Sequence, residues 1–500
     1  MESLPTESRS EMRLPSIAAL IAAVACLPGI ALAAQINVPG DHTTIQSAID
    51  ASIDGDVVIV SPGRYVENID YKGKAILLTS LDPSDATIVA NTVIDGNQAG
   101  TSVRFITNES SSSVLMGFTV TNGRGVSSWD SSAGGILCVG ASPLIVDCRI
   151  VANQGNSTFA GGGLDLGVSA ARIIRCCISA NMSRSGRGGG MLCDRSDIAV
   201  VDCDIVGNNV TGQGSAIWVR YSSIAISGAM IQGNGSMLAE NSLRFAYSTV
   251  ILSSSALVGN MCRYLNIVPT DSPLRIVNTT VADNIGYGMY AGSDIVVKNC
   301  IFRGNAVYSV DGTYQRNISV GAVGPHSFDH TLISNFQESV FISQGAQLSW
   351  GPGIIDADPL FAREGQWNDS GTPDDPSDDT FIPGDYHLLP DSPCIDAGTN
   401  DVDNPDTPEV ETLPDTDIAG LPRIIDGNLD GTATVDIGAY EYLPGDVNYD
   451  GKVNVLDLLL VRTSLGRDPA SSIEARKADV NADGAVNVED LIAVRGRLGR

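Results

Sequence analysis

Two short stretches near the C-terminal end of the chain place oxygen-bearing side chains at the same spacing. In each, places one, three, five, nine and twelve carry Asp or Asn, and place six carries Gly. Calcium takes roughly six to eight oxygen ligands, and a loop with this spacing turns them toward one centre. The predicted ligands are Asp446, Asn448, Asp450, Lys452, Asn454 and Asp457 in the first loop, and Asp479, Asn481, Asp483, Ala485, Asn487 and Asp490 in the second.

Each place in these loops has its own role. Gly451 and Gly484 allow the sharp turn at place six, and Lys452 and Ala485 offer a backbone carbonyl at place seven. Each loop also gathers three carboxylates, whose mutual repulsion opposes folding until a cation neutralises it. We therefore expect two calcium ions here, and a coupling between calcium binding and folding of this region.

One exiting helix is predicted after each loop, around 458–462 and 491–495, but the Pro-Gly pair at 444–445 leaves no room for an entering helix. Two such halves with Asp at place twelve resemble the type I dockerin family over 445–499. The resemblance implies a cohesin-like partner in an extracellular assembly, chosen in part by places ten and eleven. These places hold Val455-Leu456 and Val488-Glu489, which differ from the hydroxyl pair often found there and from each other. The difference argues against the usual cohesin and against two symmetric binding orientations.

A third stretch copies only the beginning of such a loop. Asp426, Asn428, Asp430 and Gly431 take places one, three, five and six, but Asp436 stands at place eleven instead of twelve. Two interpretations remain open: a third calcium site near Asp426, Asn428 and Asp430, or an acidic turn without metal.

A fourth group of side chains could contact a sugar. Asp194 and Arg220 take matching places in a repeat, and Asp165 and Trp218 share the neighbouring column. If this face is exposed, Trp218 could stack on a sugar ring while Asp165, Asp194 and Arg220 bond its hydroxyl groups. The interpretation that we favour is a ladder ion pair beside a packed Trp. No catalytic residue is assigned, because no paired carboxylates like those of pectin hydrolases stand on one strand of the repeat.

The repeat that positions these groups is an apolar residue followed three places later by Asn. Its Asn residues lie 21 to 28 positions apart, with a small residue five places before and an aliphatic residue eight places before each one. This drifting period is typical of a solenoid, and Gly triplets at 161–163 and 188–190 exclude a helical one. We predict a mainly β fold, a right-handed parallel β-helix over 35–355, with an internal Asn ladder. The Asn column is Asn153, Asn181, Asn208, Asn234, Asn260, Asn284 and Asn305.

Several of the ten cysteines belong to the same pattern. Cys148, Cys176, Cys203 and Cys300 share one column, which predicts stacked small core residues; a disulfide between neighbouring turns is the alternative. At the N-terminal end, Thr43 to Gln46 reads as a capping box that opens a short helix with Ile45, Ile49 and Ile53 on one face. We expect this helix to cap the solenoid, with the first turn of the solenoid formed by 56–60 and 62–65.

Before the cap, residues 1–33 read as a signal peptide, with Arg13, an apolar run and an Ala-Leu-Ala cleavage site; a lipid anchor on Cys26 is the rival reading. No later segment is long and apolar enough to span a membrane. A secreted or cell-surface protein is therefore expected. Between the solenoid and the module at 445–499, the acidic region 356–442 includes an expected exposed loop at 369–385. Its phrases at 392–398 and 435–442 resemble the C-terminal end of the β-helix family called choice-of-anchor Q.

The formal net charge of −28 argues against a nucleic-acid partner, which needs basic patches. The hypothesis is a secreted, calcium-binding β-helix protein that a dockerin-like module anchors in an assembly linked to polysaccharide binding or breakdown. The alternative is a polysaccharide lyase or glycoside hydrolase that acts on the β-helix face.

Overall fold

The computed structural model describes residues 33–125, 133–156, 160–184, 186–309, 312–372, 378–403 and 412–499. The expected signal peptide lies outside these residues, except for its last position, and so does Cys26. No helix within the described ranges is long and apolar enough to cross a membrane.

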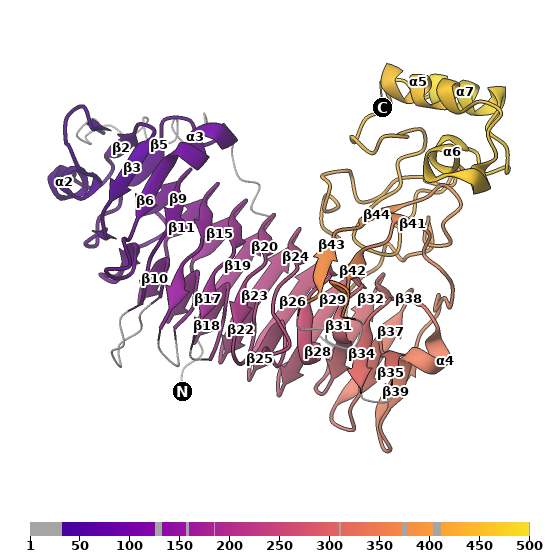
Figure 1. Cartoon of the computed structure of the whole chain (residues 1–500), viewed down its shortest axis with the longest axis horizontal. Helices are drawn as coiled ribbons and strands as arrows, with labels where there is room; N and C mark the ends of the chain where they lie inside the picture. The colour runs from indigo at the N-terminus through magenta and orange to yellow at the C-terminus, as the bar shows by residue number, and fades with distance from the viewer. Residues whose placement is uncertain are drawn as a thin grey trace.

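The chain forms a parallel β-helix in which three long sheets run side by side along one axis (Figure 1). Neighbouring strands pair in parallel one turn apart, as in Leu164↔Met191 and Ile178↔Ile205; β34 and β35 pair antiparallel. The fold class predicted from the repeat is therefore confirmed.

The first sheet contains, in spatial order, β1 (Gln35–Val38), β2 (Val57–Val60), β5 (Leu77–Ser80), β8 (Val114–Met116), β11 (Leu144–Val146), β15 (Arg172–Ile174), β19 (Asp197–Val201), β23 (Ser223–Ser227), β26 (Thr249–Ser253), β29 (Leu274–Val277), β32 (Ile295–Lys298), β37 (Pro325–Asp329) and β40 (Gln347–Trp350). The second contains β4 (Ile69–Asp70), β7 (Val103–Phe105), β10 (Ile136–Val139), β14 (Leu164–Gly167), β18 (Met191–Asp194), β22 (Ile217–Arg220), β25 (Leu243–Ala246), β28 (Met261–Thr270), β31 (Ile285–Ala291), β34 (Ala306–Ser309), β35 (Gly312–Gln315), β36 (Ile318–Val320) and β39 (Val340–Ile342).

The third sheet contains β3 (Gly63–Val66), β6 (Thr92–Asp95), β9 (Thr119–Thr121), β12 (Arg149–Val151), β16 (Cys177–Ser179), β20 (Asp204–Val206), β24 (Met230–Gln232), β27 (Ala256–Val258), β30 (Thr280–Ala282), β33 (Ile301–Arg303) and β38 (Leu332–Ile333). A short side sheet joins β13 (Gln154–Gly155), β17 (Met182–Ser183) and β21 (Asn209–Val210). Two small helices lie in loops of the solenoid, α3 (Ala86–Asn91) and α4 (Phe336–Ser339).

The predicted Asn ladder is confirmed. From Asn153 to Asn305, each Nδ2 donates to the Oδ1 of the next Asn along the axis, at 2.7 to 3.1 Å. The ladder also runs one step further than the repeat indicated, to Asn317, at 2.9 Å from Asn305. Because each amide is buried and bonded on both sides, the column holds successive turns in register.

The cysteines form part of the core. Cys148, Cys176 and Cys203 occupy successive turns at 1–2% exposure, and all nine cysteines of the described ranges are free thiols. The structure thus has the stacked core that we predicted and not the alternative disulfide.

The N-terminal cap differs in detail from the prediction. Helix α2 (Ile45–Ala51) begins one residue later than expected, because Thr44, and not Thr43, caps it by accepting a hydrogen bond from the N–H of Ser47. Ile53 lies beyond the helix and is 60% exposed, so it does not extend the apolar face. The expected first turn corresponds to β2 and β3, but β1 precedes the helix and pairs with β2, so the first sheet begins before that turn.

The acidic region packs along the late turns of the solenoid. Buried side chains of β27, β30, β33 and β38 form one core cluster with Phe361, Tyr386, Ile437 and Tyr442. Its strands are β41 (Phe361–Arg363), which pairs with β44 (Asp385–Leu388), and β42 (Gln366–Asn368), which pairs with β43 (Thr380–Ile382). The expectation of an exposed loop at 369–385 is therefore wrong in part, because β43 and the start of β44 fall within it.

The C-terminal module stands on this region, on the far end of the molecule from α2 (Figure 1). It contains α5 (Val455–Ser464), the short 3₁₀ helix η1 (Pro469–Ser471), α6 (Ile473–Ala478) and α7 (Val488–Arg495). Its core contains residues from equivalent positions of the two halves, such as Val447 and Val480, or Val461 and Val494. Two equivalent halves thus pack against each other around these valines.

Candidate functional site

The two acidic loops close onto the helices that follow them. Asn454 caps α5 and Asn487 caps α7, and each helix begins with a complete capping box. The place-twelve carboxylates accept from the N–H of these caps, at 2.8 Å for both Asp457 and Asp490. The residue that closes each loop is therefore also the residue that fixes the start of its helix.

The glycine turns have the geometry that the spacing predicted. The N–H of Gly451 donates to Asp446 Oδ2 at 2.8 Å, and the N–H of Gly484 donates to Asp479 Oδ2 at 2.9 Å. Both glycines have positive φ, +80° and +87°, which a residue with a Cβ rarely adopts. The backbone thus folds each loop around the carboxylate at place one.

Burial places two of the three carboxylates of each loop, those at places one and twelve, in a costly environment. Asp446 and Asp479 are 3% and 5% exposed, and Asp457 and Asp490 are fully buried. Burial raises the pKa of Asp446, the N–H of Gly451 offsets this in part, and the Asp457 carboxylate raises it further. The pKa of Asp479 is raised in the same way by burial and by Asp490. A divalent cation would relieve both the desolvation and the repulsion.

The donor set of each loop fits calcium. Within the described residues, there is no metal site made only of three or more His, Cys, Asp or Glu side chains. The loops instead mix Asp carboxylates with Asn amide oxygens and a backbone carbonyl, which is the hard, all-oxygen set that calcium prefers.

The third, partial loop has the same beginning and a different closure. The N–H of Gly431 donates to Asp426 Oδ2 at 3.1 Å, as at place six of the other loops. Asp436 is buried and accepts from the N–H groups of Asp396 and Tyr442. The N–H of Asn428 donates to Asp396 Oδ2 at 2.6 Å, whereas the matching N–H of Asn448 donates to Asp457. Asp396 thus accepts the hydrogen bond that Asp457 accepts in the first loop. The sequence interpretation had considered Asp436 for this position and did not identify Asp396.

The suggested sugar-contacting face is mostly inaccessible. Asp165 and Trp218 are each 3% exposed, so the idea that they touch a sugar is wrong. Strands β14, β18 and β22 do bring the four candidates into register, with Asp165 and Trp218 in one column and Asp194 and Arg220 in another. Arg220 makes two hydrogen bonds to Asp194, at 2.9 and 3.0 Å, and its guanidinium lies 5.4 Å from the Trp218 ring centroid. The structure contains the ion pair beside a packed Trp.

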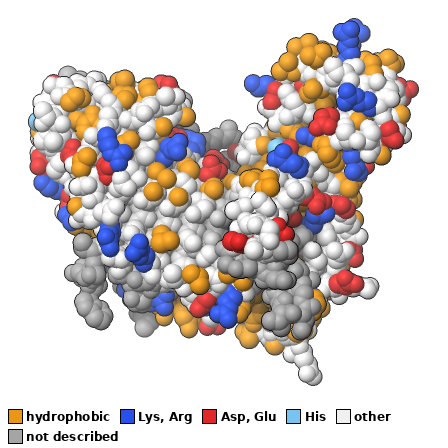
Figure 2. All heavy atoms as spheres, viewed as in Figure 1, with side chains coloured by type: hydrophobic (Ala, Val, Ile, Leu, Met, Phe, Trp, Pro, Cys, Tyr) orange, Lys and Arg blue, Asp and Glu red, His pale blue; other side chains and the backbone are white. Residues whose placement is uncertain are grey.

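The surface of the module is apolar where it faces away from the solenoid. Helix α5 exposes Val455, Leu456, Leu459 and Leu460, whereas the matching places of α7 hold Val488, Glu489, Ile492 and Ala493. Figure 2 shows hydrophobic side chains gathered at the top of this module. An exposed apolar cluster of this kind is typical of a protein–protein interface.

Sequence reasoning missed the contacts that join the module to the acidic region 356–442. Tyr449, at place four of the first loop, contacts His387 and Lys477, and its hydroxyl reaches the backbone of β44. Place four of the second loop is Ala482. This Tyr–Ala difference between otherwise matched loops is the signal that could have located the contact.

The comparisons with known proteins bear on the two parts of the chain separately. No curated protein matches the chain. Among solved structures, a crystal structure of pectate lyase Pel9A shows 13% sequence identity and a TM-score of 0.47, over 83% of this chain and 98% of that one. A likeness at this level supports no inference about activity. Residues 444–499, which carry both acidic loops and helices α5, α6 and α7, match the family described as Dockerin type I domain.

Proposed function

We propose that the two loops each bind one calcium ion, and that the helices ordered by these ions anchor the β-helix in an extracellular assembly by binding a cohesin-like partner. Type I dockerin domains bind calcium, and a dockerin implies binding to cohesin in an assembly. The calcium ligands are the twelve residues that the sequence predicted. Support comes from the mixed oxygen donors of each loop and from the capping boxes that join each loop to a helix.

The observation that carries the proposal is the apolar face on α5. Leu456 and Leu459 are both 52% exposed and follow directly on the cap that Asp457 completes. Burying such side chains contributes about 25 cal/mol for each Å² of apolar surface removed from water. Since α7 has Glu489 where α5 has Leu456, the interface should centre on α5.

The test is binding of the full chain to immobilised type I cohesins, with calcium and with a chelator. Leu456→Glu gives α5 the residue of α7 and is expected to weaken binding at least tenfold, while the reciprocal Glu489→Leu is expected not to weaken it. Chelation should abolish binding. Binding that survives both Leu456→Glu and chelation would refute the proposal.

We also propose a third calcium site, formed by Asp426, Asn428 and Asp430 and closed by Asp396. It is supported by the loop-like bonds to Asp426 and Asp396. Calorimetric titration of the full chain should then give three ions, and two for Asp396→Asn. A stoichiometry of two for both proteins would leave the acidic turn without metal. We further propose that residues 356–442 belong to the β-helix family called choice-of-anchor Q.

A second candidate function is polysaccharide binding beside the Asp194–Arg220 pair. Tyr221 and Tyr247, both 52% exposed, stack with ring centroids 5.1 Å apart, and the Arg220 guanidinium lies 5.4 Å from the Tyr221 ring. Exposed aromatic rings next to charged hydrogen-bonding groups suit sugars. Pull-down by a panel of insoluble polysaccharides should be lost with Tyr221→Ala plus Tyr247→Ala. Reducing-end or unsaturated-product formation that Asp194→Ala and Arg220→Ala abolish would instead favour a glycoside hydrolase or lyase.

A further inference from the structure

We propose that the first calcium loop (loop 1) is also the part of the module that docks on the acidic region 356–442, so that calcium binding at loop 1 and docking of the module are coupled. The inference rests on the proposed function, because it takes both loops to be calcium sites. Loop 2, which has the same ligands, lacks the docking residue.

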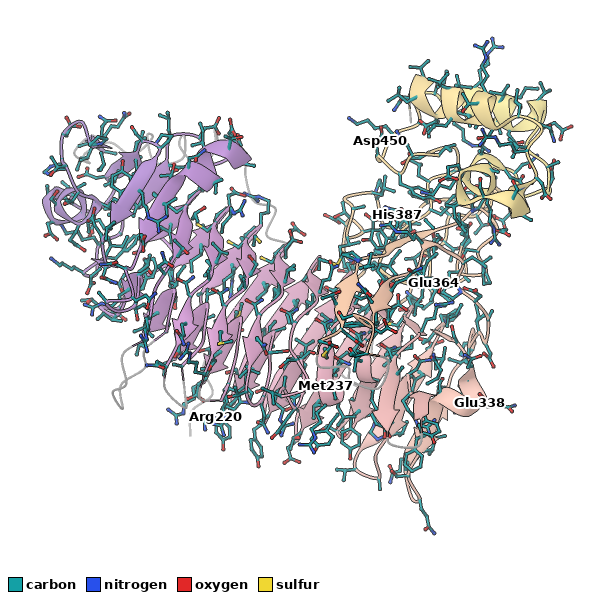
Figure 3. The ribbon with its side chains drawn as sticks, in the orientation of Figure 1. Arg220, Met237, Glu338, Glu364, His387 and Asp450 are labelled. Atoms are coloured by element: carbon teal, nitrogen blue, oxygen red, sulfur yellow. The ribbon has the colours of Figure 1, made fainter. Side chains whose placement is uncertain are left out.

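The docking contact is centred on Tyr449. Its hydroxyl donates to the carbonyl oxygen of Leu388 at 3.0 Å, and its ring stacks on that of His387 with centroids 4.8 Å apart and an interplanar angle of 8°. Lys477 Nζ, from α6, lies 4.2 Å from the centroid of the same ring. Figure 3 shows His387 at the base of the module, below the loop that carries Asp450. The Tyr449 side chain thus makes a hydrogen bond, a ring-stacking contact and a cation–π contact at the same time.

Asp385 ties these contacts together. His387 Nδ1 lies 2.6 Å from Asp385 Oδ1, and Lys477 Nζ lies 3.5 Å from Asp385 Oδ2. Burial alone raises the pKa of Asp385, but the hydrogen bond from His387 and the charges of His387 and Lys477 lower it to about 2 overall. The acidic region therefore presents a stable carboxylate to the module.

A further ion pair joins α6 to the acidic region. Arg476 donates twice to Asp391, at 2.7 and 3.1 Å, but both side chains are about a third or more exposed. Exposed pairs of this kind contribute about 0–1 kcal/mol. The Tyr449 contact, which combines a hydrogen bond with ring stacking, is therefore the stronger link between the module and the acidic region.

Coupling follows from the position of Tyr449 within the loop. It lies between Asn448 and Asp450 and has a φ of +59°, a conformation that the tight loop requires. Without a cation, the carboxylates of Asp446, Asp450 and Asp457 repel one another and favour an open loop. Opening the loop moves Tyr449 away from Leu388 and His387. Docking therefore stabilises the loop conformation that binds calcium, and calcium stabilises the docked conformation by the same factor.

Loop 2 provides an internal control. Ala482 has nearly the same φ, +53°, but is exposed and too short to reach the acidic region. Next to it lies a crevice of about 350 Å³, lined by Pro390 and Asp391 on one side and by Pro469, Arg476 and Gly484 on the other. Loop 2 is connected to the docking contacts only through α6, whose C-cap is Asp479. Calcium at loop 2 should therefore order α7 and affect docking less than calcium at loop 1 does. Calcium at loop 1 should also fix the direction in which the apolar face of α5 points.

The experiment measures calcium affinity at one loop at a time in the full chain. Asp479→Asn with Asp483→Asn silences loop 2, and Asp446→Asn with Asp450→Asn silences loop 1. In the first background, Tyr449→Ala is expected to raise the calcium Kd of loop 1 by roughly 5- to 100-fold. In the second background, the same substitution should change the Kd of loop 2 less than twofold. Calorimetry gives both constants.

His387→Ala provides a variant outside the module, so that misfolding of the loop cannot mimic the result. It should weaken loop 1 in the same direction, and calcium should protect the amides of 385–388 from hydrogen exchange in the parent chain but not in Tyr449→Ala. An unchanged loop 1 Kd in both variants overturns the inference, while the proposed function stands. If calcium binds in neither background, the proposed function itself is refuted.

Discussion

Arg423 and Glu441 form an ion pair that is almost entirely hidden from solvent. Arg423 Nη1 lies 2.9 Å from Glu441 Oε1, and the side chains are 1% and 0% exposed. Arg423 Nη2 also donates to Ser254 Oγ of the solenoid at 2.7 Å and to the carbonyl of Ala439 at 3.1 Å. The pair therefore joins the acidic region to the β-helix from the inside.

Replacing Arg423 by Met is expected to cost about 3–5 kcal/mol of unfolding free energy, because Glu441 is left buried without its partner. Burial and the nearby Asp436 already raise the pKa of Glu441 well above its usual range. The loss should therefore be larger at pH 8 than at pH 5, where Glu441 can take up a proton. Urea unfolding at both pH values measures it. The double variant Arg423→Met with Glu441→Gln should recover part of the stability, and equal losses for single and double variants would contradict this account.

Asn208→Ala is expected to interrupt the internal ladder. Asn208 Nδ2 donates to the carbonyl of Ile178 and to Asn234, and its Oδ1 accepts from the backbone and side chain of Asn181. Since several buried groups lose their partners, the cost should be at least about 3 kcal/mol. The exposed Asn91→Ala serves as a control and should change stability by less than about 0.5 kcal/mol. Similar chemical-denaturation midpoints for both variants would argue against a structural ladder.

Asp165 should make the fold less stable as the pH rises. Its pKa is raised to about 7 overall: burial is the main cause, the N–H of Gly161 offsets it in part, and the Asp194 carboxylate adds to it. Because the folded chain holds the proton more tightly than the unfolded chain, this group destabilises the fold progressively between about pH 4 and pH 7, by at most about 1.4 kcal/mol per pH unit. Asp165→Asn should reduce the slope of unfolding free energy against pH in that window. A slope equal to that of the parent chain would show that Asp165 titrates normally.

Removal of calcium should unfold the module and leave the β-helix intact. The carboxylates at places one and twelve are buried in each loop, so without a cation their repulsion opposes helices α5 and α7. Circular dichroism with a chelator should show loss of helix at unchanged strand content, reversed by added calcium. Asp457→Asn should weaken only the first site, with Asp490→Asn as its matched counterpart in the second. Helix content that is indifferent to chelation would contradict this prediction.

The repeat in the sequence was enough to predict the solenoid, because each turn places the same residue types at the same positions. The Asn, Cys and aliphatic columns each report burial on one side of a short strand. The two acidic loops were equally readable, since the proposed ligands of each come from one short segment, and Asn454 with Asp457 completes a local capping box. The sequence by itself therefore determined the features that depend on residues close together along the chain, namely the turns of the solenoid and the two loops with their helix caps.

Contacts between distant segments required the tertiary structure. The sequence could not show that Trp218 is buried. The alternation of side chains along a strand indicates on which face of the sheet a residue lies, but not whether other residues cover that face. Asp396 stands 32 residues from Asn428 and Leu388 stands 61 residues from Tyr449, so no spacing rule joins them. Such pairs depend on how the acidic region folds back on the solenoid. That path is decided by burial of apolar side chains, which has no fixed sequence period.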